Sequence, residues 1–264
     1  ELIFAECPTL IATHCEDTPT IKANEERFRQ QYGEDVPFSA HPLIRSEEAC
    51  YKSTVLATTL ARSHGTRLHV LHISTAKELE LFEPGPLITN QGGKRITAEV
   101  CAHMLHFDDR AYATKGALIK CNPAIKTAAD RLALLEGLRD GRLAVIATDH
   151  APHTLAEKGE KYFKAPSGLP LVQHSLLMLL EHVHDGTLPL ELIVEKTSHR
   201  VADLFAIRDR GYIREGYFAD LVLIDPRSPT TVRREDVLSK CGWSPFEGDT
   251  FRSSIVMTIV NGVV

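Results

Sequence analysis

The stretch Ala144–His153, AVIATDHAPH, decides the fold of this chain. It opens with a short apolar run of the kind that forms a strand buried on both faces. The run stops at Thr148-Asp149-His150, where a carboxylate and an imidazole stand at the junction of strand and loop. In barrels and open sheets of parallel strands, chemistry takes place at the carboxyl ends of the strands. Asp149 is therefore a candidate site residue, and the alternative is that it caps a following helix.

Two further apolar stretches end in the same way. Thr9–Asp17, TLIATHCED, leads into His14, and Arg67–Ser74, RLHVLHIS, leads into His72. A single histidine at a strand end is more often a core or surface residue, but three strand ends that carry His or Asp indicate a shared site. Neutral imidazoles and a carboxylate are typical ligands of zinc and similar divalent ions. Because the three stretches are far apart in the sequence, they can meet only through folding, as they do around the mouth of a barrel.

Four motifs in order, HCED, LHVLHIST, IKCNPAIK and ATDHAPH, resemble the amidohydrolase superfamily and, within it, the dihydroorotases. The resemblance continues through APSGLP at 165–170, ADLVLIDP at 219–226 and SPFEG at 244–248, and so covers essentially the whole chain. It implies an α/β fold, a (β/α)₈ TIM-type barrel with a small β-sandwich appendage formed by the chain ends. It also implies a metal-dependent hydrolase that acts on cyclic amides.

The resemblance assigns the metal and the catalytic roles to three residues. His14 and His72 are expected to bind one metal ion. Asp149 is expected to bind a second ion and to act as the catalytic residue that carries the proton. Glu16 and Asp17 are expected to orient His14 or to cap the segment after them. The implied cofactor is Zn²⁺, one or two ions per subunit, with Mn²⁺ or Co²⁺ as alternatives.

The resemblance also predicts the residues that contact the substrate. These are Asn122, His153 and the backbone around Gly168, while His150 is expected to support the metal site without binding the ion. The alternative for Asn122 is an Asx turn before Pro123, and the alternative for Gly168 is a plain loop glycine.

Composition is that of an ordinary globular protein. The chain has 264 residues, a net charge of -5, 43% hydrophobic and 25% charged residues. Nothing indicates a nucleic-acid-binding face, and no apolar run approaches the roughly 18–20 residues of a membrane span. The six cysteines show no CxxC spacing, so we expect reduced thiols in a cytoplasmic protein.

Apolar spacing and capping patterns predict the elements. We expect strands at 10–13, 67–73, 96–100, 117–120 and 143–147, and helices at 46–64, 127–140, 171–184, 190–198 and 201–205. The segment up to Ala40 and the segment after His153 are predicted to be polar loops. From Gly211 onward the pattern is one of strands, with a strand–turn–strand unit around the Asn-Gly pair in Ser254–Val264.

The number of βα units decides the architecture. A closed barrel needs eight strands, and only about five βα units are visible. We therefore expect 1–207 to be a barrel portion that lacks the first strands, and 208–264 to be the C-terminal part of the small β domain. An open doubly wound sheet is the alternative, but no Gly-rich phosphate loop follows any strand. The HxH pair that the family carries on its first barrel strand, and the carboxylated lysine usual on its fourth, do not occur here; HVH at 182–184 lies in a helical pattern.

The resemblance implies the reversible cyclisation of N-carbamoyl-L-aspartate to L-dihydroorotate, a step of pyrimidine synthesis. Hydantoinases and allantoinases, which open similar rings with the same metal chemistry, are the first alternative. A catalytically silent dihydroorotase-like subunit of aspartate transcarbamoylase is the second. The expected partners are thus the small-molecule substrate, a second copy in a homodimer, and aspartate transcarbamoylase.

Overall fold

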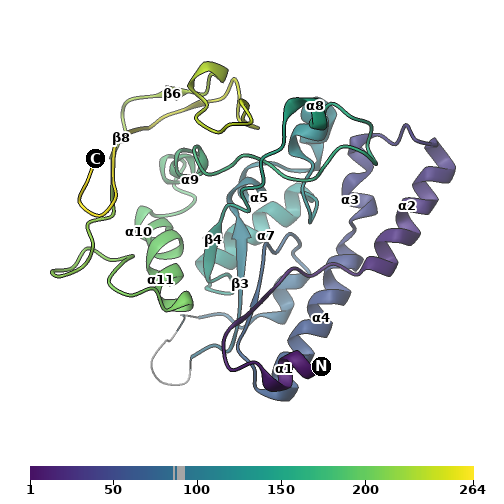
Figure 1. Ribbon diagram of the computed structural model, residues 1–264, viewed down its shortest axis with the longest axis horizontal. Helices are drawn as coiled ribbons and strands as arrows, with labels where there is room; N and C mark the ends of the chain where they lie inside the picture. The colour runs from purple at the N-terminus through teal and green to yellow at the C-terminus, as the bar shows by residue number, and fades with distance from the viewer. Residues whose placement is uncertain (86, 88–92) are drawn as a thin grey trace.

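The computed structural model describes residues 1–85, 87 and 93–264, and a sheet of four parallel strands lies at its centre (Figure 1). The sheet order follows the sequence, β1 (Ile11–Thr13), β2 (Leu68–Val70), β3 (Ile96–Cys101) and β4 (Val145–Ala147). Every neighbouring pair is parallel, with Ile11 opposite Leu68 and Leu68 opposite Ile96. Parallel strands that are adjacent in both sequence and space, with helices between them, are built from βα units, as the sequence predicts.

Eleven α-helices lie in the described residues, and most of them connect or follow these strands. They are α1 (Leu2–Glu6), α2 (Thr18–Tyr32), α3 (His41–Ile44), α4 (Glu47–His64), α5 (Ala102–His106), α6 (Tyr112–Lys115), α7 (Ala128–Arg139), α8 (Leu155–Lys158), α9 (Ser175–His184), α10 (Leu190–Val194) and α11 (Arg200–Phe205). Short 3₁₀ turns are η1 (Phe38–Ala40), η2 (Glu78–Leu81), η3 (Asp109–Ala111), η4 (Gly116–Ile119) and η6 (Arg234–Asp236), and η5 (Glu195–His199) is a π turn.

The predicted helix ends at 46–64 and 127–140 are confirmed by their caps. The Ser46 side chain accepts a hydrogen bond from the backbone N–H of Ala49, and Gly65 ends α4 with a left-handed φ of 63°. Thr127 and Asp130 form a reciprocal capping box at the start of α7. Polar caps are local signals, which is why the sequence locates these boundaries well.

Three predicted segments are wrong. The expected polar loop after His153 contains the short helix α8, which Thr154 caps by accepting a hydrogen bond from the N–H of Glu157. The expected polar loop before Ala40 contains α2, which Asp17 caps by accepting a hydrogen bond from the N–H of Thr20. Only two side chains of this helix are buried, so its apolar periodicity is faint. The expected strand at 117–120 is instead the 3₁₀ turn η4, because an apolar run this short does not by itself distinguish strand from helix.

The C-terminal part forms two antiparallel ribbons, β5 (Leu221–Asp225) with β8 (Ser254–Ile259) and β6 (Thr230–Thr231) with β7 (Thr250–Phe251). The strand–turn–strand unit expected at 254–264 is reduced to one bridge between Val260 and Val263, because β8 pairs with β5.

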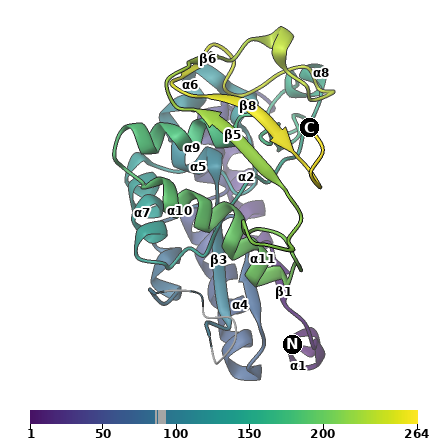
Figure 2. The same ribbon diagram turned by 90° about the vertical axis from the view of Figure 1, so that its left-hand side faces the viewer.

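The first residues of this chain lie away from the C-terminal ribbons. The N-terminal helix α1 contacts α4, and it lies at the opposite end of the molecule from the ribbons (Figures 1 and 2). The reason is that β1 begins soon after α1 and ties the start of the chain to the amino edge of the sheet. The boundary between 207 and 208 stays a prediction; α11 ends at Phe205, and β5 begins at Leu221.

None of the described helices is both long and apolar enough to cross a bilayer. All six cysteines lie in the described residues and are free thiols.

A buried histidine links α3 to the loops above the sheet. His41 is fully buried, and its Nε2 lies 2.7 Å from the carbonyl oxygen of Cys121 while its Nδ1 lies 2.7 Å from the hydroxyl of Tyr162. A carbonyl only accepts, so Nε2 carries the proton and Nδ1 accepts from the tyrosine. Burial lowers the pKa of His41 well below its ordinary value. The ring is therefore neutral in the folded protein.

We expect the free energy of unfolding to fall as the pH drops from 7.5 to 5.5. The unfolded chain protonates this histidine near its ordinary pKa while the folded chain does not, so the stabilisation is present above about pH 6.5 and is lost below it. Each such histidine contributes a slope of up to about 1.4 kcal/mol per pH unit. Urea titrations across this range measure the slope, which His41→Gln should reduce and His64→Gln, at an exposed position, should not. A slope that His41→Gln leaves unchanged contradicts this role of His41.

Candidate active site

The three predicted strand-end residues stand at the same edge of the sheet. His14 follows β1 directly, and His72 and Asp149 each lie two residues beyond β2 and β4. Because the strands are parallel and adjacent, their carboxyl ends share one edge. Folding thus brings together segments that are distant in sequence, as a shared site requires.

His14 and His72 face each other through ring nitrogens. Nδ1 of His14 lies 3.0 Å from Nε2 of His72. Two nitrogens that bind one zinc ion at about 2.0–2.1 Å are roughly 3.0–3.4 Å apart. The spacing of the two imidazoles therefore fits two ligands of one divalent ion.

A buried carboxylate orients the first of these rings. Oε2 of Glu16 lies 3.0 Å from Nε2 of His14 and also accepts a hydrogen bond from Arg45. Burial alone would raise the pKa of Glu16, but the hydrogen bond from His14 and the positive charge of Arg45 hold it below its ordinary value. The ionised carboxylate thus keeps a proton on Nε2 and leaves the lone pair of Nδ1 directed towards His72. A carboxylate behind a histidine in this way is typical of metal sites.

His72 and Asp149 have strained backbones. Their φ angles are 41° and 49°, in the left-handed region that residues with side chains rarely adopt. Such conformations cost on the order of 1–3 kcal/mol each and cluster at functional sites. Burial, followed by the nearby His14, lowers the pKa of His72, whereas the carboxylate of Asp149 acts to raise it. Asp149 is thus close enough to His72 to influence its charge.

Asp149 does not complete a ligand group with the two histidines. Across residues 1–85, 87 and 93–264, no three His, Cys, Asp or Glu side chains gather closely enough to hold an ion. The described residues therefore supply a pair of ligands, and the metal roles of all three residues stay predictions.

Asn122 lies in the loop that follows η4. Its Oδ1 is buried and has no hydrogen-bond partner among the described residues. A buried acceptor without a partner is unfavourable by about 1–3 kcal/mol unless another molecule satisfies it. This atom is therefore well suited to the predicted contact with a substrate.

The loops that carry His153 and Gly168 are packed against each other. Nε2 of His153 lies 3.2 Å from the carbonyl oxygen of Ser167 and must donate to it. Gly168 has a φ of 142°, and a Cβ there would lie 2.4 Å from the carbonyl oxygen of Ala151. The N–H of Gly168 donates to the carbonyl of Lys120 at 2.8 Å. The N–H of Gly168 is therefore not available to a substrate.

His150 turns away from Asp149 towards the following segment. Its Nδ1 accepts hydrogen bonds from the backbone N–H groups of Leu171 and Val172, at 2.9 and 3.2 Å. The ring thus joins the end of β4 to the chain beyond Gly168. Its predicted support of the metal site stays a prediction.

Sequence reasoning missed several residues that hold the site in place. Arg45 neutralises Glu16, and the indole N–H of Trp243 donates to the carbonyl of His153 at 2.7 Å. Lys158 lies in the segment predicted to be a polar loop, yet it is buried. Trp243 is the single tryptophan of the chain, which was a usable signal. Arg45 and Lys158 gave none, because basic residues in polar segments are usually exposed.

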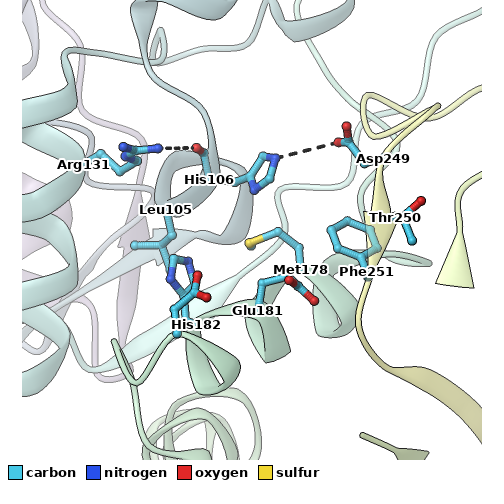
Figure 3. Close-up of a pocket in the computed structure, with 10 residues that line it drawn as sticks. Leu105, His106, Arg131, Met178, Glu181, His182, Asp249, Thr250 and Phe251 are labelled. Atoms are coloured by element: carbon cyan, nitrogen blue, oxygen red, sulfur yellow. Dashed lines mark hydrogen bonds and ion pairs between the residues drawn. The ribbon is translucent and has the colours of Figure 1, made fainter. Parts of the chain in front are cut away.

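A separate cavity of about 420 Å³ lies between α5, α7, α9 and β7 (Figure 3). Arg131 donates a hydrogen bond to the carbonyl oxygen of His106 at 2.8 Å, and Nε2 of His106 lies 3.8 Å from Oδ2 of Asp249. The carboxylates of Glu181 and Asp185 are paired with Arg252. None of the predicted site residues lines this cavity.

Comparison with known proteins gives a consistent result. Residues 5–264 match the family described as the Amidohydrolase family. A dihydroorotase of Methanothermobacter thermautotrophicus is 31% identical over 99% of this chain, and a dihydroorotase of Anoxybacillus flavithermus is 36% identical over 96%. The chain spans 58% and 57% of the lengths of these two proteins.

Solved structures show the same architecture. The L-hydantoinase (dihydropyrimidinase) of Arthrobacter aurescens superposes with a TM-score of 0.90 over 99% of this chain, at 27% identity, and the chain covers 58% of it. A dihydropyrimidinase of Brevibacillus agri superposes with a TM-score of 0.84 over 98% of the chain and 57% of that structure, at 24% identity. The fold is therefore that of a TIM-barrel hydrolase, with β1–β4 as an arc of the barrel wall.

Proposed function

The chain belongs to the amidohydrolase family, and from this premise we propose that it catalyses the dihydroorotase reaction, the reversible cyclisation of N-carbamoyl-L-aspartate to L-dihydroorotate. The observation that carries the proposal is the facing pair of His14 and His72 at the strand ends, with Asp149 at the same edge. The dihydroorotase relatives, at 31% and 36% identity, support this substrate. We place the reaction in pyrimidine synthesis and in the cytoplasm, in keeping with six free thiols.

His14 and His72 would hold a divalent ion, and Asp149 would contact a second one. A bound ion supplies two things, a lowered pKa of water and polarisation of the amide carbonyl. Zinc is the metal of first choice for this donor set, and Mn²⁺ or Co²⁺ are alternatives.

Asp149 would move the proton. In the hydrolytic direction its carboxylate accepts a proton from the attacking water and then delivers it to the ring nitrogen as the amide C–N bond breaks. The return reaction uses the same path in reverse. Asp149 lies beyond the end of β4, is exposed, and forms no ion pair with other described residues. Its carboxylate is therefore accessible to a substrate.

Asn122 and His153 would bind the substrate away from the reacting bond. The buried Oδ1 of Asn122 accepts from a ring N–H. The Nδ1 of His153 forms no hydrogen bond within the described part of the chain, which leaves it available to a substrate.

Hydantoinase or allantoinase activity is the second candidate, favoured by the TM-score of 0.90 to an L-hydantoinase. The experiment measures hydrolysis of dihydroorotate, hydantoin and allantoin by the complete gene product, before and after chelation. Turnover of dihydroorotate alone, lost on chelation and recovered with zinc, supports the proposal. Turnover of hydantoin or allantoin instead overturns the substrate. No turnover and no bound metal supports a silent subunit, for which aspartate transcarbamoylase is the partner to test; a homodimer stays a prediction.

Glu16→Gln is expected to weaken metal binding about 10- to 100-fold, because a neutral amide accepts a weaker hydrogen bond from Nε2–H of His14 and no longer makes the ring a more basic ligand. Competition with a chromophoric zinc chelator measures the affinity in the complete gene product. Glu26→Gln, which removes an exposed carboxylate from α2, is the matched control. Equal affinities in the Glu16→Gln variant and the unchanged protein would refute the orienting role of Glu16.

A further inference from the structure

Two lysines, one from the predicted polar loop after His153 and one from the end of the apolar run 117–120, turn into the protein beside the candidate substrate site. Lys158, in α8, is 2% exposed, and Lys120, just after η4, is 7% exposed. Buried lysines usually pair with a carboxylate. Within the described residues neither of these two lysines forms an ion pair, so their ammonium groups must donate hydrogen bonds to uncharged acceptors.

Both ammonium groups bind backbone carbonyls. Nζ of Lys158 donates to the carbonyl oxygens of Lys120, Pro166 and Gly168, at 3.2, 3.0 and 3.0 Å. An ammonium has three N–H donors, so Lys158 uses all of them. Nζ of Lys120 donates to the carbonyls of Tyr162 and Ala165, each at 2.6 Å.

The contacts of Lys158 form a closed ring between two segments. The N–H of Gly168 donates to the carbonyl of Lys120, Lys158 donates to that same carbonyl, and it also donates to the carbonyl of Gly168. One segment carries Asn122 two residues further on, and the other carries Ser167, which accepts from His153. The ring therefore fixes the distance between the two proposed substrate-binding residues.

We propose that Lys158 is a positioning residue for substrate binding: its ammonium group joins the segments that carry Asn122 and His153 and sets their spacing. This inference rests on the proposed function, since it concerns the same site. Asn122 and His153 bind the substrate away from the reacting bond. A change in the distance between these two residues weakens binding of the substrate and of the transition state equally. Such a change raises KM and leaves kcat nearly unchanged.

The first test compares Lys158→Met with Lys164→Met in the complete gene product, using dihydroorotate as the substrate. Lys164 is exposed in the same loop, so its variant removes the same charge without the three hydrogen bonds. Lys158→Met is expected to raise KM by about tenfold or more, since a hydrogen bond to a charged group is worth at least about a factor of ten. The kcat is expected to stay within roughly threefold of the original value. Unchanged KM in Lys158→Met, or an equal rise in Lys164→Met, overturns the proposal.

A rescue experiment distinguishes the effect of the ammonium group of Lys158 from the effect of the space that its side chain fills. Lys158→Ala leaves a space that propylammonium matches in length and charge, and 1-propanol matches in size alone. Propylammonium is expected to bring KM back towards that of the unchanged protein, and 1-propanol is not. Equal rescue by both compounds would show that Lys158 only fills space, and the proposal would fail.

Amide hydrogen exchange tests the ring without any substrate. The peptide over residues 165–171 contains the N–H of Gly168, and its exchange should be about tenfold faster in Lys158→Met and unchanged in Lys164→Met. This result decides the matter even if the unchanged protein does not turn over dihydroorotate, an outcome that would overturn the proposed function alone. Unaltered exchange in Lys158→Met would overturn the positioning role.

Discussion

Asp149→Asn is expected to lower kcat for dihydroorotate hydrolysis by about 10²- to 10⁴-fold, the range typical of a lost general acid–base catalyst. Asparagine is nearly the same size and its amide oxygen still accepts hydrogen bonds. It cannot take a proton from water or deliver one to the leaving nitrogen. The loss should therefore fall on kcat, while the KM for dihydroorotate changes little.

The backbone at this position makes asparagine an unusually clean replacement. Asp149 has a φ of 49°, and asparagine and aspartate are among the side-chain-bearing residues that tolerate the left-handed region best. The residue is also exposed, so the exchange removes no packing. Alanine would add conformational strain to the chemical change and would confuse the two effects.

Asp209→Asn is the matched control for Asp149→Asn. Asp209 also has a left-handed φ, 57°, in the segment between α11 and β5. Its variant should keep the activity and the stability of the unchanged protein. If Asp149→Asn retained full kcat, or if both variants lost it equally, Asp149 would not be the proton carrier.

The strand ends were the most predictable part of the molecule. His14, His72 and Asp149 each come after an apolar run, and parallel strands built from such runs carry the residues beyond their carboxyl ends to one edge of the sheet. Local pattern and a general rule of sheet geometry suffice for this prediction. Glu16 was predictable in the same way as a residue that orients His14, since a carboxylate two residues beyond a strand-end histidine lies within reach of its ring.

The burial of basic residues was not predictable in the same way. Lys158 lies in the polar segment LAEKGEKYFK, where every local signal favours exposure, and its neighbours Lys161 and Lys164 are indeed exposed. Its three partners are backbone carbonyls, one of them on a segment far back in the sequence. Any residue can provide a carbonyl, so no side-chain pattern marks the site of such a contact.

Short apolar runs set a second limit. Ala117–Lys120 and Val145–Ala147 look alike in sequence, but the first is a 3₁₀ turn and the second is an interior strand. Gly116, with a φ of 51°, turns the chain just before the first run, and the sheet already has β3 and β4 as direct neighbours. The sheet order that decides between the two is a tertiary property, which periodicity does not encode.

Gly168→Ala is expected to lower the free energy of unfolding by about 3–5 kcal/mol, because two penalties add at this position. The φ of 142° belongs to a region that is essentially restricted to glycine. The new Cβ would also lie 2.4 Å from the carbonyl oxygen and 2.8 Å from the Cβ of Ala151. Neither atom is the mobile end of a side chain, so the backbone itself must move.

Gly186→Ala separates the two penalties. Gly186 has a φ of 66°, and no atom of the described residues lies within 4 Å of the position that a Cβ would take there. Its variant should therefore lose only the roughly 1–2 kcal/mol of left-handed strain. Urea unfolding of both variants in the complete gene product gives the difference, which we expect to be at least about 2 kcal/mol. Equal losses of unfolding free energy in the two variants would mean that the loop at Gly168 shifts at little energetic cost to make room for the new Cβ. In that case the close approach of 151 and 168 would not fix the loop that carries His153, and the ring closed by Lys158 would have to hold that loop without it.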